Sequence, residues 1–426
     1  MGLERTRNSL RGFRRRAFSG RNFSNMNVKR HRFLCAFLAL AVFVSALFPV
    51  SVSAQEPEQT AAETLTAEDA QQMQQTDQAV AALTGSDAYR ALSPDERRAA
   101  ALEQLNALSD EGLVKAKSIC VDDENGMIGF AYPCGVWGGI LLQDPDDAND
   151  LSTLSLSSEV QQPLTLTDLK KNKLEDFGTA MIYYAFDNTI NSSRYPYYSY
   201  MKGFWSALGL DTRLDTTVTI SDLKKMGQYD LCILSAHGAY YTHRYGLLWR
   251  RTTTEPVILL TEEATPYRDL KYGIDLLSHR IIKVNGLYAV TPDFFRSAYF
   301  FSPMDGTIVL SETCEFGGVD GSPDSAMGDA LLSAGASVVL GYVNNVYTVY
   351  SRSILWDTVN QLILGYPIES ALSHAKATYG DNDLVWYRAQ GGRRPHAAAA
   401  VPQLYGDTQA MLNVPYYVRG SLQTAA

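Results

Sequence analysis

The spacing of hydrophobic positions along the chain predicts strands that alternate with helices. From about Leu164, short continuous apolar runs alternate with segments whose apolar residues recur every three or four positions. Thr179–Ala185 and Tyr229–Ala236 are apolar throughout, as expected of strands buried on both faces. Tyr347–Leu364 and Pro367–Tyr379 have the period of amphipathic helices. This alternation predicts a three-layer α/β sandwich, with a mostly parallel sheet covered by helices on both faces.

The region between His237 and Cys314 interrupts this alternation. We expect an insert around residues 239–302, in which Val257–Leu260 and Ile281–Ala289 form an antiparallel ribbon. The remaining elements expected in the main domain, residues 164–426, are strands at Thr216–Ile220, Gly306–Leu310 and Ser337–Tyr342, and helices at Tyr195–Leu208, Ser221–Gly227 and Ser325–Leu332.

A separate pattern precedes the main domain. Ser93 followed by Pro94 and Glu96 is typical of a helix start, with a capping serine and a glutamate three residues later. Segment 118–142 predicts strands around a turn at Asn125-Gly126. We therefore expect a small N-terminal α+β module at residues 84–145. A flexible segment at 55–83, loosely ordered or helical, would precede the module, and a linker rich in Asp, Ser and Pro would follow at 146–163.

The first 54 residues have the pattern of a signal peptide. Phe33–Phe48 is an almost unbroken apolar run, preceded by four basic residues and followed by the small residues Val52-Ser53-Ala54. We expect cleavage near Ala54 and a true translation start at Met26. The mature protein is then secreted or held at the cell surface. No second apolar run is long enough to span a membrane, so no stable membrane anchor is expected.

Removal of the leader changes the charge balance of the chain. The whole chain carries a net charge of −9, and residues 1–54 hold ten Lys/Arg against one acid, a net of +9. The mature part is therefore at −9 − 9 = −18. A protein this acidic is a poor candidate for binding nucleic acid, so neither DNA nor RNA is expected as a partner.

Four cysteines remain after cleavage of the leader. Cys120 and Cys134 flank the expected hairpin and could form a disulfide in an oxidising compartment, although two unpaired thiols are the alternative. Cys232 lies within an apolar strand and is expected to be a buried small residue. Cys314 is left over, and a lone thiol in an exported protein calls for an explanation.

The most reactive side chains follow neighbouring predicted strands. His237-Gly238 ends the strand Tyr229–Ala236, and Cys314 follows the strand Gly306–Leu310. Functional groups collect beyond the carboxyl ends of parallel strands, so adjacent strands would bring His237 and Cys314 together. An imidazole next to a thiol can remove its proton and later protonate a leaving amine. The N–H groups of Gly238 and Cys314 could then hold the developing oxyanion.

Signatures of other chemistries are absent from the sequence. It contains no His-Glu-x-x-His or paired Cys-x-x-Cys metal motif, no Gly-x-Ser-x-Gly elbow, no phosphate loop and no dinucleotide fingerprint. No metal or other cofactor is expected. Activation by a calcium ion is an alternative that the sequence does not support.

The blocks around His237 and Cys314 resemble the caspase-like cysteine peptidase superfamily, which includes legumains, clostripains, gingipains, separases and CHAT-domain proteins. Leu231–Gly238 and Ile308–Cys314 are similar to its two strand-end motifs, and Glu312–Gly317 is similar to the Glu-Ala-Cys-Glu-Ser-Gly of legumains. Ala330–Gly341 resembles the helix, turn and strand that follow the nucleophile in gingipain-like peptidases and CHAT domains. The likeness covers about Leu164 to Leu412. It departs from the family in its long His-to-Cys gap and in Thr313, where a small residue is usual.

The resemblance implies an exported cysteine endopeptidase that cleaves peptide or protein substrates, with Cys314 as nucleophile and His237 as base. Asp187 and Asn188 are similar to the pocket-forming Asp-Asn pair of clostripain-like enzymes. Glu312 and Asp320 are further candidates for a substrate pocket, and Glu312 could instead orient His237. The N-terminal module is of the kind that covers a cleft or docks a partner. The alternative is a non-catalytic binding protein, secreted or surface-associated, on the same fold.

Overall fold

The computed structural model describes residues 64–122, 126–142, 178–186, 196–245, 251–384 and 399–412. At positions 244, 245 and 251 it describes the backbone alone. The predicted signal peptide and the linker at 146–163 lie outside these residues. Within them, no helix is both long and apolar enough to cross a membrane.

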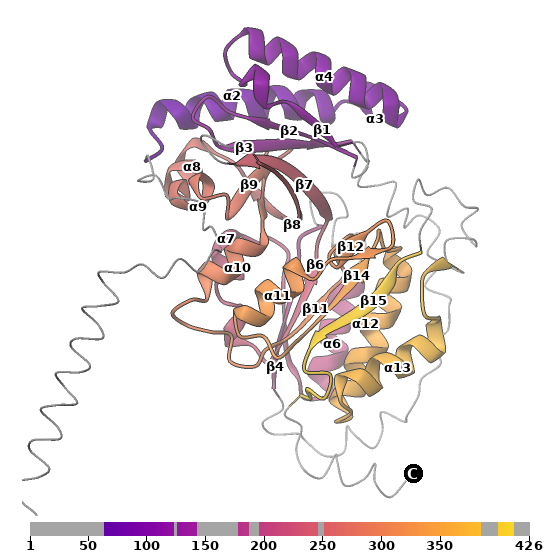
Figure 1. The fold of residues 1–426 in the computed structure, drawn as a ribbon. Coiled ribbons are helices and arrows are strands. Elements are labelled where there is room, and N and C mark those ends of the chain that lie inside the picture. Colours follow the sequence, from indigo (N-terminus) through magenta and orange to yellow (C-terminus); the bar gives the residue numbers. More distant parts are fainter. Residues whose placement is uncertain are drawn as a thin grey trace, which may run out of the picture. The chain divides into compact units, whose positions relative to one another are not determined.

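A six-stranded mixed sheet forms the centre of the main domain (Figure 1). Five strands run parallel, and β15 pairs with β14 in the antiparallel sense. In spatial order the strands are β15 (Val401–Gly406), β14 (Val338–Val343), β11 (Ile308–Ser311), β6 (Leu231–Ser235), β4 (Thr179–Tyr184) and β5 (Asp211–Asp215). The chain leaves β4 first toward β5 and then returns to β6 on the other side. The strand order therefore reverses between β4 and β6, where open α/β sheets usually bind ligands.

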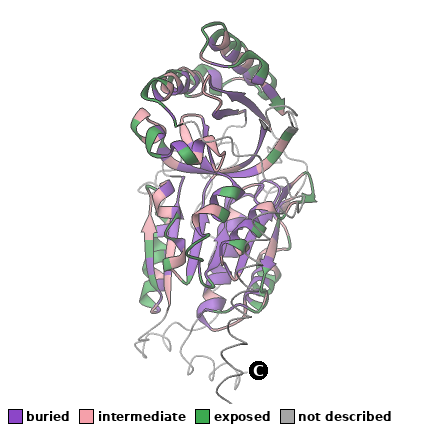
Figure 2. Cartoon of the chain, turned by 60° about the vertical axis from the view of Figure 1, so that its left-hand side comes forward, coloured by how far each residue is buried: buried purple, intermediate pink, exposed green. Residues whose placement is uncertain are grey.

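Alternate residues of β6 face two different hydrophobic cores. Leu231 and Ile233 belong to a cluster with the helices of one face, whereas Cys232 and Leu234 belong to a cluster with the helices of the other. All four side chains are buried, as Figure 2 shows for most of the sheet. The first face is covered by α6 (Tyr197–Ala207), α12 (Thr348–Ile363) and α13 (Ile368–Tyr379), and the second by α7 (Ile220–Leu223), α10 (Pro292–Ala298) and α11 (Ala326–Ser333). The expected α/β sandwich, a mostly parallel sheet with helices on both faces, is therefore confirmed.

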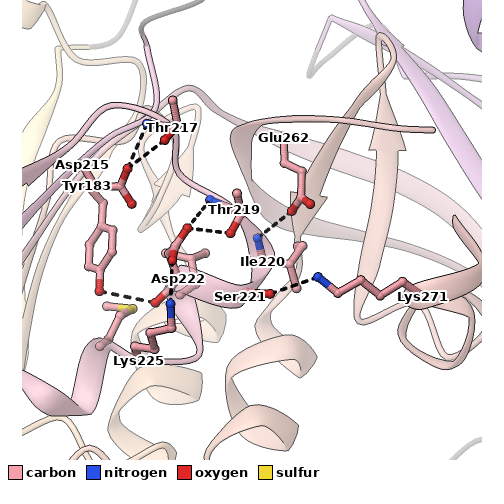
Figure 3. Close-up of polar contacts among 12 residues, drawn as sticks. Tyr183, Asp215, Thr217, Thr219, Ile220, Ser221, Asp222, Lys225, Glu262 and Lys271 are labelled. Carbon is pink, nitrogen blue, oxygen red and sulfur yellow. Dashed lines mark hydrogen bonds and ion pairs between the residues drawn. The ribbon is translucent and has the colours of Figure 1, made fainter. Parts of the chain in front are cut away.

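One predicted strand of this sheet is wrong. Thr216–Ile220 does not form a strand: β5 lies earlier, at Asp211–Asp215, and Ile220 begins α7. Because β5 lies at the edge of the sheet, a mostly polar sequence with Thr212 buried is sufficient there. Thr219 instead starts α7, since its N–H and hydroxyl both donate to the Asp222 carboxylate, at 3.2 and 2.6 Å (Figure 3).

A second, seven-stranded sheet combines the N-terminal strands with the insert. The predicted antiparallel ribbon is present as β8, β9 and β10, with β7 added, but β9 also pairs with the N-terminal strand β3 in the parallel sense. The spatial order is β1 (Cys120–Asp122), β2 (Met127–Ala131), β3 (Trp137–Leu141), β9 (Ile281–Val284), β10 (Leu287–Val290), β8 (Arg251–Glu263) and β7 (Gly238–Tyr245). The strands of the N-terminal module expected at 84–145 therefore complete a sheet built largely by the insert.

Helices precede and interrupt this second sheet. Residues 67–84, expected in part as a flexible segment, form helix α2 (Ala67–Thr84), whose Met73 and Val80 are buried in the same core as β2 and β3. The helix predicted to start after Ser93 is confirmed as α4, with the expected capping box. The remaining elements are α3 (Asp87–Arg90), α4 (Pro94–Asp110), α8 (Pro266–Lys271), α9 (Gly273–Leu277), the short 3₁₀ turns Ala116–Ser118 and Met226–Gln228, and the hairpin strands β12 (Gly318–Val319) and β13 (Ser322–Pro323).

Glu262 connects the insert to the main domain through the start of α7. This buried side chain on β8 accepts a hydrogen bond from the Ile220 N–H at 2.9 Å (Figure 3). It also accepts from the Tyr272 hydroxyl at 3.0 Å and pairs with Arg268 at 3.3 Å. The carboxylate lies at the start of a helix, and both of its oxygens accept hydrogen bonds. Both features stabilise the contact between β8 and α7.

Candidate active site

The structure brings His237-Gly238 and Cys314 to the same edge of the six-stranded sheet. Strands β6 and β11 are parallel neighbours in which Ser311 lies opposite Leu234, and the Glu312 N–H donates to the Leu234 carbonyl at 2.8 Å. Both strands therefore end at the same level, directly before His237 and Cys314. This position lies beside the reversal of strand order between β4 and β6.

Gly238 makes the closest approach between the two segments. A Cβ atom built on Gly238 would overlap the Thr313 Cγ2 atom and the Cys314 carbonyl oxygen, and would lie 3.3 Å from the Cys314 carbonyl carbon. The backbone φ of Gly238 is not in the left-handed region, so close packing and not backbone conformation accounts for glycine here. The segments that carry the predicted base and nucleophile are thus in direct backbone contact.

His237 occupies a partly buried position next to an aromatic ring. The Phe186 ring meets the imidazole edge to face, with ring centroids 4.5 Å apart, and the His237 carbonyl accepts a hydrogen bond from the Leu259 N–H at 2.9 Å. Burial disfavours the charged form and lowers the pKa of His237 to about 4. At neutral pH the imidazole is therefore uncharged and able to accept a proton.

Cys314 is partly exposed at the start of a sharp turn. Its thiol lies 3.8 Å from the Val346 carbonyl, which it can reach as a weak donor. On its N-terminal side, the Thr313 N–H donates to the Ser311 hydroxyl at 3.2 Å, and that hydroxyl donates to Thr313 Oγ1 at 2.7 Å. The Thr313 side chain is thus fully buried and hydrogen-bonded where it packs against Gly238.

Glu315 is a site residue that the sequence did not single out, although it directly follows Cys314 in the quoted motif. Its backbone is left-handed, with φ of 53°, and its carboxylate is buried. One oxygen accepts from the Tyr240 N–H at 3.2 Å and the other from the Asn345 amide at 2.6 Å. Burial raises the pKa of Glu315 to about 7, although both hydrogen bonds oppose the shift. Glu315 therefore connects the segment after His237 with the loop next to the Cys314 thiol.

Glu312 is placed away from the surface. Its carboxylate accepts from the Tyr198 hydroxyl at 2.5 Å and from the Ser351 hydroxyl at 3.2 Å, on helices α6 and α12, and only 5% of the residue is exposed. Burial raises the pKa of Glu312 despite these donors. A structural role between β11 and the two helices fits this position better than the predicted place in a substrate pocket.

The other pocket candidates have different outcomes. Asp320 is exposed at the turn between β12 and β13, five residues after Glu315, with a left-handed φ of 49°. Asp187 and Asn188 lie outside the described residues, so their prediction is unchanged.

The disulfide predicted between Cys120 and Cys134 does not form in the structure. Cys134 is a free thiol whose sulfur contacts the Met73 sulfur at 3.7 Å. Cys120 lies opposite Gly129 and its sulfur approaches the Gly129 and Thr242 carbonyls, at 3.5 and 3.6 Å. The two sulfurs point to different neighbours because Cys134 lies beyond the end of β2. Cys232 is fully buried, as predicted.

Among the residues that the structure describes, no three or more His, Cys, Asp or Glu side chains are grouped so that they could hold a metal ion. Comparison of the chain with known protein families and with characterised proteins finds no match.

Proposed function

We propose that this protein is an exported cysteine endopeptidase with Cys314 as nucleophile and His237 as general base. One observation carries the proposal: His237-Gly238 and Cys314 end two neighbouring parallel strands, and Gly238 packs against the Cys314 backbone. The caspase-like resemblance implies this arrangement. Peptides or proteins are the expected substrates, and the pattern of the first 54 residues supports export.

The protonation state of His237 favours one order of events. Its pKa of about 4 leaves the imidazole neutral at neutral pH, so it accepts the Cys314 proton as the thiol attacks the peptide carbonyl. The proton then passes to the leaving amine, and water hydrolyses the acyl-enzyme. The N–H groups of Gly238 and Cys314 are the proposed donors to the oxyanion.

A non-catalytic binding protein on the same fold is the second candidate. It is favoured by the same low pKa of His237, because an uncharged imidazole gives no cationic stabilisation to a thiolate at rest. The two candidates differ in the reactivity of Cys314. A peptidase requires an attacking sulfur that a thiol alkylator also reaches, whereas a binding protein does not.

The proposal is tested with three forms of the mature chain: the parent, Cys314→Ala and the control Cys134→Ser. Each is incubated with a mixed peptide library, and the products are read by mass spectrometry. Cleavage by the parent and by Cys134→Ser that disappears in Cys314→Ala is the expected result. Equal product patterns from all three folded proteins would contradict a peptidase and favour the binding protein.

A further inference from the structure

A buried lysine lies between two carboxylates, and none of the three residues belongs to the proposed active site. Lys283 on β9 has a fully buried side chain, and its Nζ lies 2.5 Å from Asp77 Oδ2 on α2 and 3.2 Å from Asp269 Oδ2 on α8. The Tyr132 hydroxyl donates to Asp77 Oδ1, and the Tyr288 hydroxyl donates to Asp269 Oδ1 at 2.7 Å. All five side chains are buried.

The charges of this cluster do not balance if every group is ionised. One ammonium would face two carboxylates in an interior where an unpaired charge is costly. Burial raises the pKa of Asp77 and of Asp269, which favours a proton on one of the two carboxyl groups. Transfer of the lysine proton to Asp77 would produce a neutral amine beside a neutral carboxylic acid, the two forms that condense to an amide.

The distances suit this condensation. A carbon–oxygen bond of about 1.23 Å places Nζ no more than about 3.7 Å from the Asp77 carboxyl carbon. This upper limit is close to the separation of about 3–3.5 Å from which groups react when they are well oriented. The third group, Asp269, touches the same nitrogen and can carry a proton between the reacting atoms.

We propose that Lys283 and Asp77 form an intramolecular isopeptide bond. The Lys283 amine attacks the Asp77 carboxyl carbon, while the Tyr132 hydroxyl donates to the oxygen that gains negative charge. Asp269 accepts the proton from nitrogen and returns it to the departing Asp77 oxygen, which leaves as water. One carbon–nitrogen bond forms and one carbon–oxygen bond breaks, with no oxidant, reductant or co-reactant. The product is a neutral amide whose N–H can donate to Asp269.

Such a bond would join α2 to β9 covalently, two elements separated by 283 − 77 = 206 positions in the sequence. It would hold the N-terminal helix on the insert even if the chain were cut between residues 143 and 177. Helix α2 could then not be released by processing. This inference is independent of the peptidase proposal, because it uses none of the residues of the candidate active site.

Intact-mass spectrometry of the purified, denatured mature chain tests the bond directly. The expected mass is lower than that of the sequence by one water. Because cyclisation of an aspartate also removes water, a tryptic map must in addition contain a branched peptide that joins the segment around Asp77 to the segment around Lys283. A folded parent protein with the full mass, and with both segments recovered as separate linear peptides, would overturn the proposal and leave an ion pair only.

Variants assign the roles within the cluster. Lys283→Ala and Asp77→Ala should have the full mass and no branched peptide, whereas Lys271→Arg, at an exposed lysine that also lies in the insert, should be linked like the parent. Asp269→Asn retains both reacting groups, so we expect at least a tenfold lower linked fraction in freshly folded protein. Linkage of Asp269→Asn at the parent rate would refute the proton transfer through Asp269.

Discussion

Substitution of Gly238 by alanine tests whether the segments of His237 and Cys314 really meet. The added methyl group would overlap both Thr313 Cγ2 and the Cys314 carbonyl oxygen, and one of these atoms belongs to the backbone. A side chain can rotate away, but the backbone oxygen can be relieved only if the two segments separate. We estimate this separation at about 1 Å, which is enough to lower kcat/KM about 100-fold when reacting groups are misplaced. Overpacking should also lower the free energy of unfolding by about 1–3 kcal/mol.

The assay combines urea unfolding with the rate of Cys314 alkylation and, where cleavage is found, kcat/KM on the best library peptide. Gly203→Ala is the matched control, because nothing lies within 4 Å of a Cβ built at that position on α6. Alanine there should leave activity unchanged and stabilise the protein by about 0.5–1 kcal/mol. Adding Thr313→Ala to Gly238→Ala should restore only part of the loss, since the Cys314 oxygen remains in the way. A Gly238→Ala variant with parental stability and parental Cys314 reactivity would refute the close approach.

Three further predictions concern ionisable groups, two of them in the candidate site and one at the contact between β8 and α7. If His237 is the base and burial holds its pKa near 4, kcat/KM should decline only below about pH 4, whereas an acidic limb near pH 6.5 would show that burial does not lower the pKa of this imidazole. Burial raises the pKa of Glu315 from 4.5 to about 7 on folding. Between these two pH values the folded state holds a proton that the unfolded state has lost, so the contribution of Glu315 to the unfolding free energy falls as the pH rises. Glu315→Gln should therefore gain about 3 kcal/mol relative to the parent between these two pH values, and parallel stability curves would show that Glu315 does not titrate there. Glu262→Ala leaves the Ile220 N–H without its buried acceptor and should lower the free energy of unfolding in urea by about 1–3 kcal/mol. Glu262→Gln keeps an oxygen acceptor and should lower it less. Equal losses of unfolding free energy in the two variants would contradict a role for this hydrogen bond.

Local patterns were sufficient to predict most of the six-stranded sheet. Continuous apolar runs predicted β4, β6, β11 and β14, because a strand buried on both faces has few polar residues. The edge strands were missed or misplaced: β5 is largely polar, and β15 contains Pro402 and has only two buried residues. An edge strand has one neighbour and an open side, so its sequence is less constrained.

The candidate site, too, was only partly predictable from local patterns in the sequence. Placing His237 and Cys314 together required only that the two strands before them be parallel neighbours. The role of Glu315 depends on a left-handed backbone and on the Asn345 amide, which come from a turn and a loop that no periodicity describes. Glu312, next to the nucleophile motif, turns inward because the end of β11 directs it toward α6 and α12.

The sequence by itself determined most of the elements of the central sheet, their alternation and the residues that end its central strands, since hydrophobic period and turn chemistry are local properties of the chain. Only the tertiary structure decided that β3 pairs with β9, that α2 packs on the insert, and that Lys283 lies between Asp77 and Asp269. Apart from the short step from Lys283 to Asp269, these contacts join segments more than a hundred residues apart. Nothing in the local pattern of either segment specifies its partner, because partners are selected by the shape and charge of surfaces that exist only after folding.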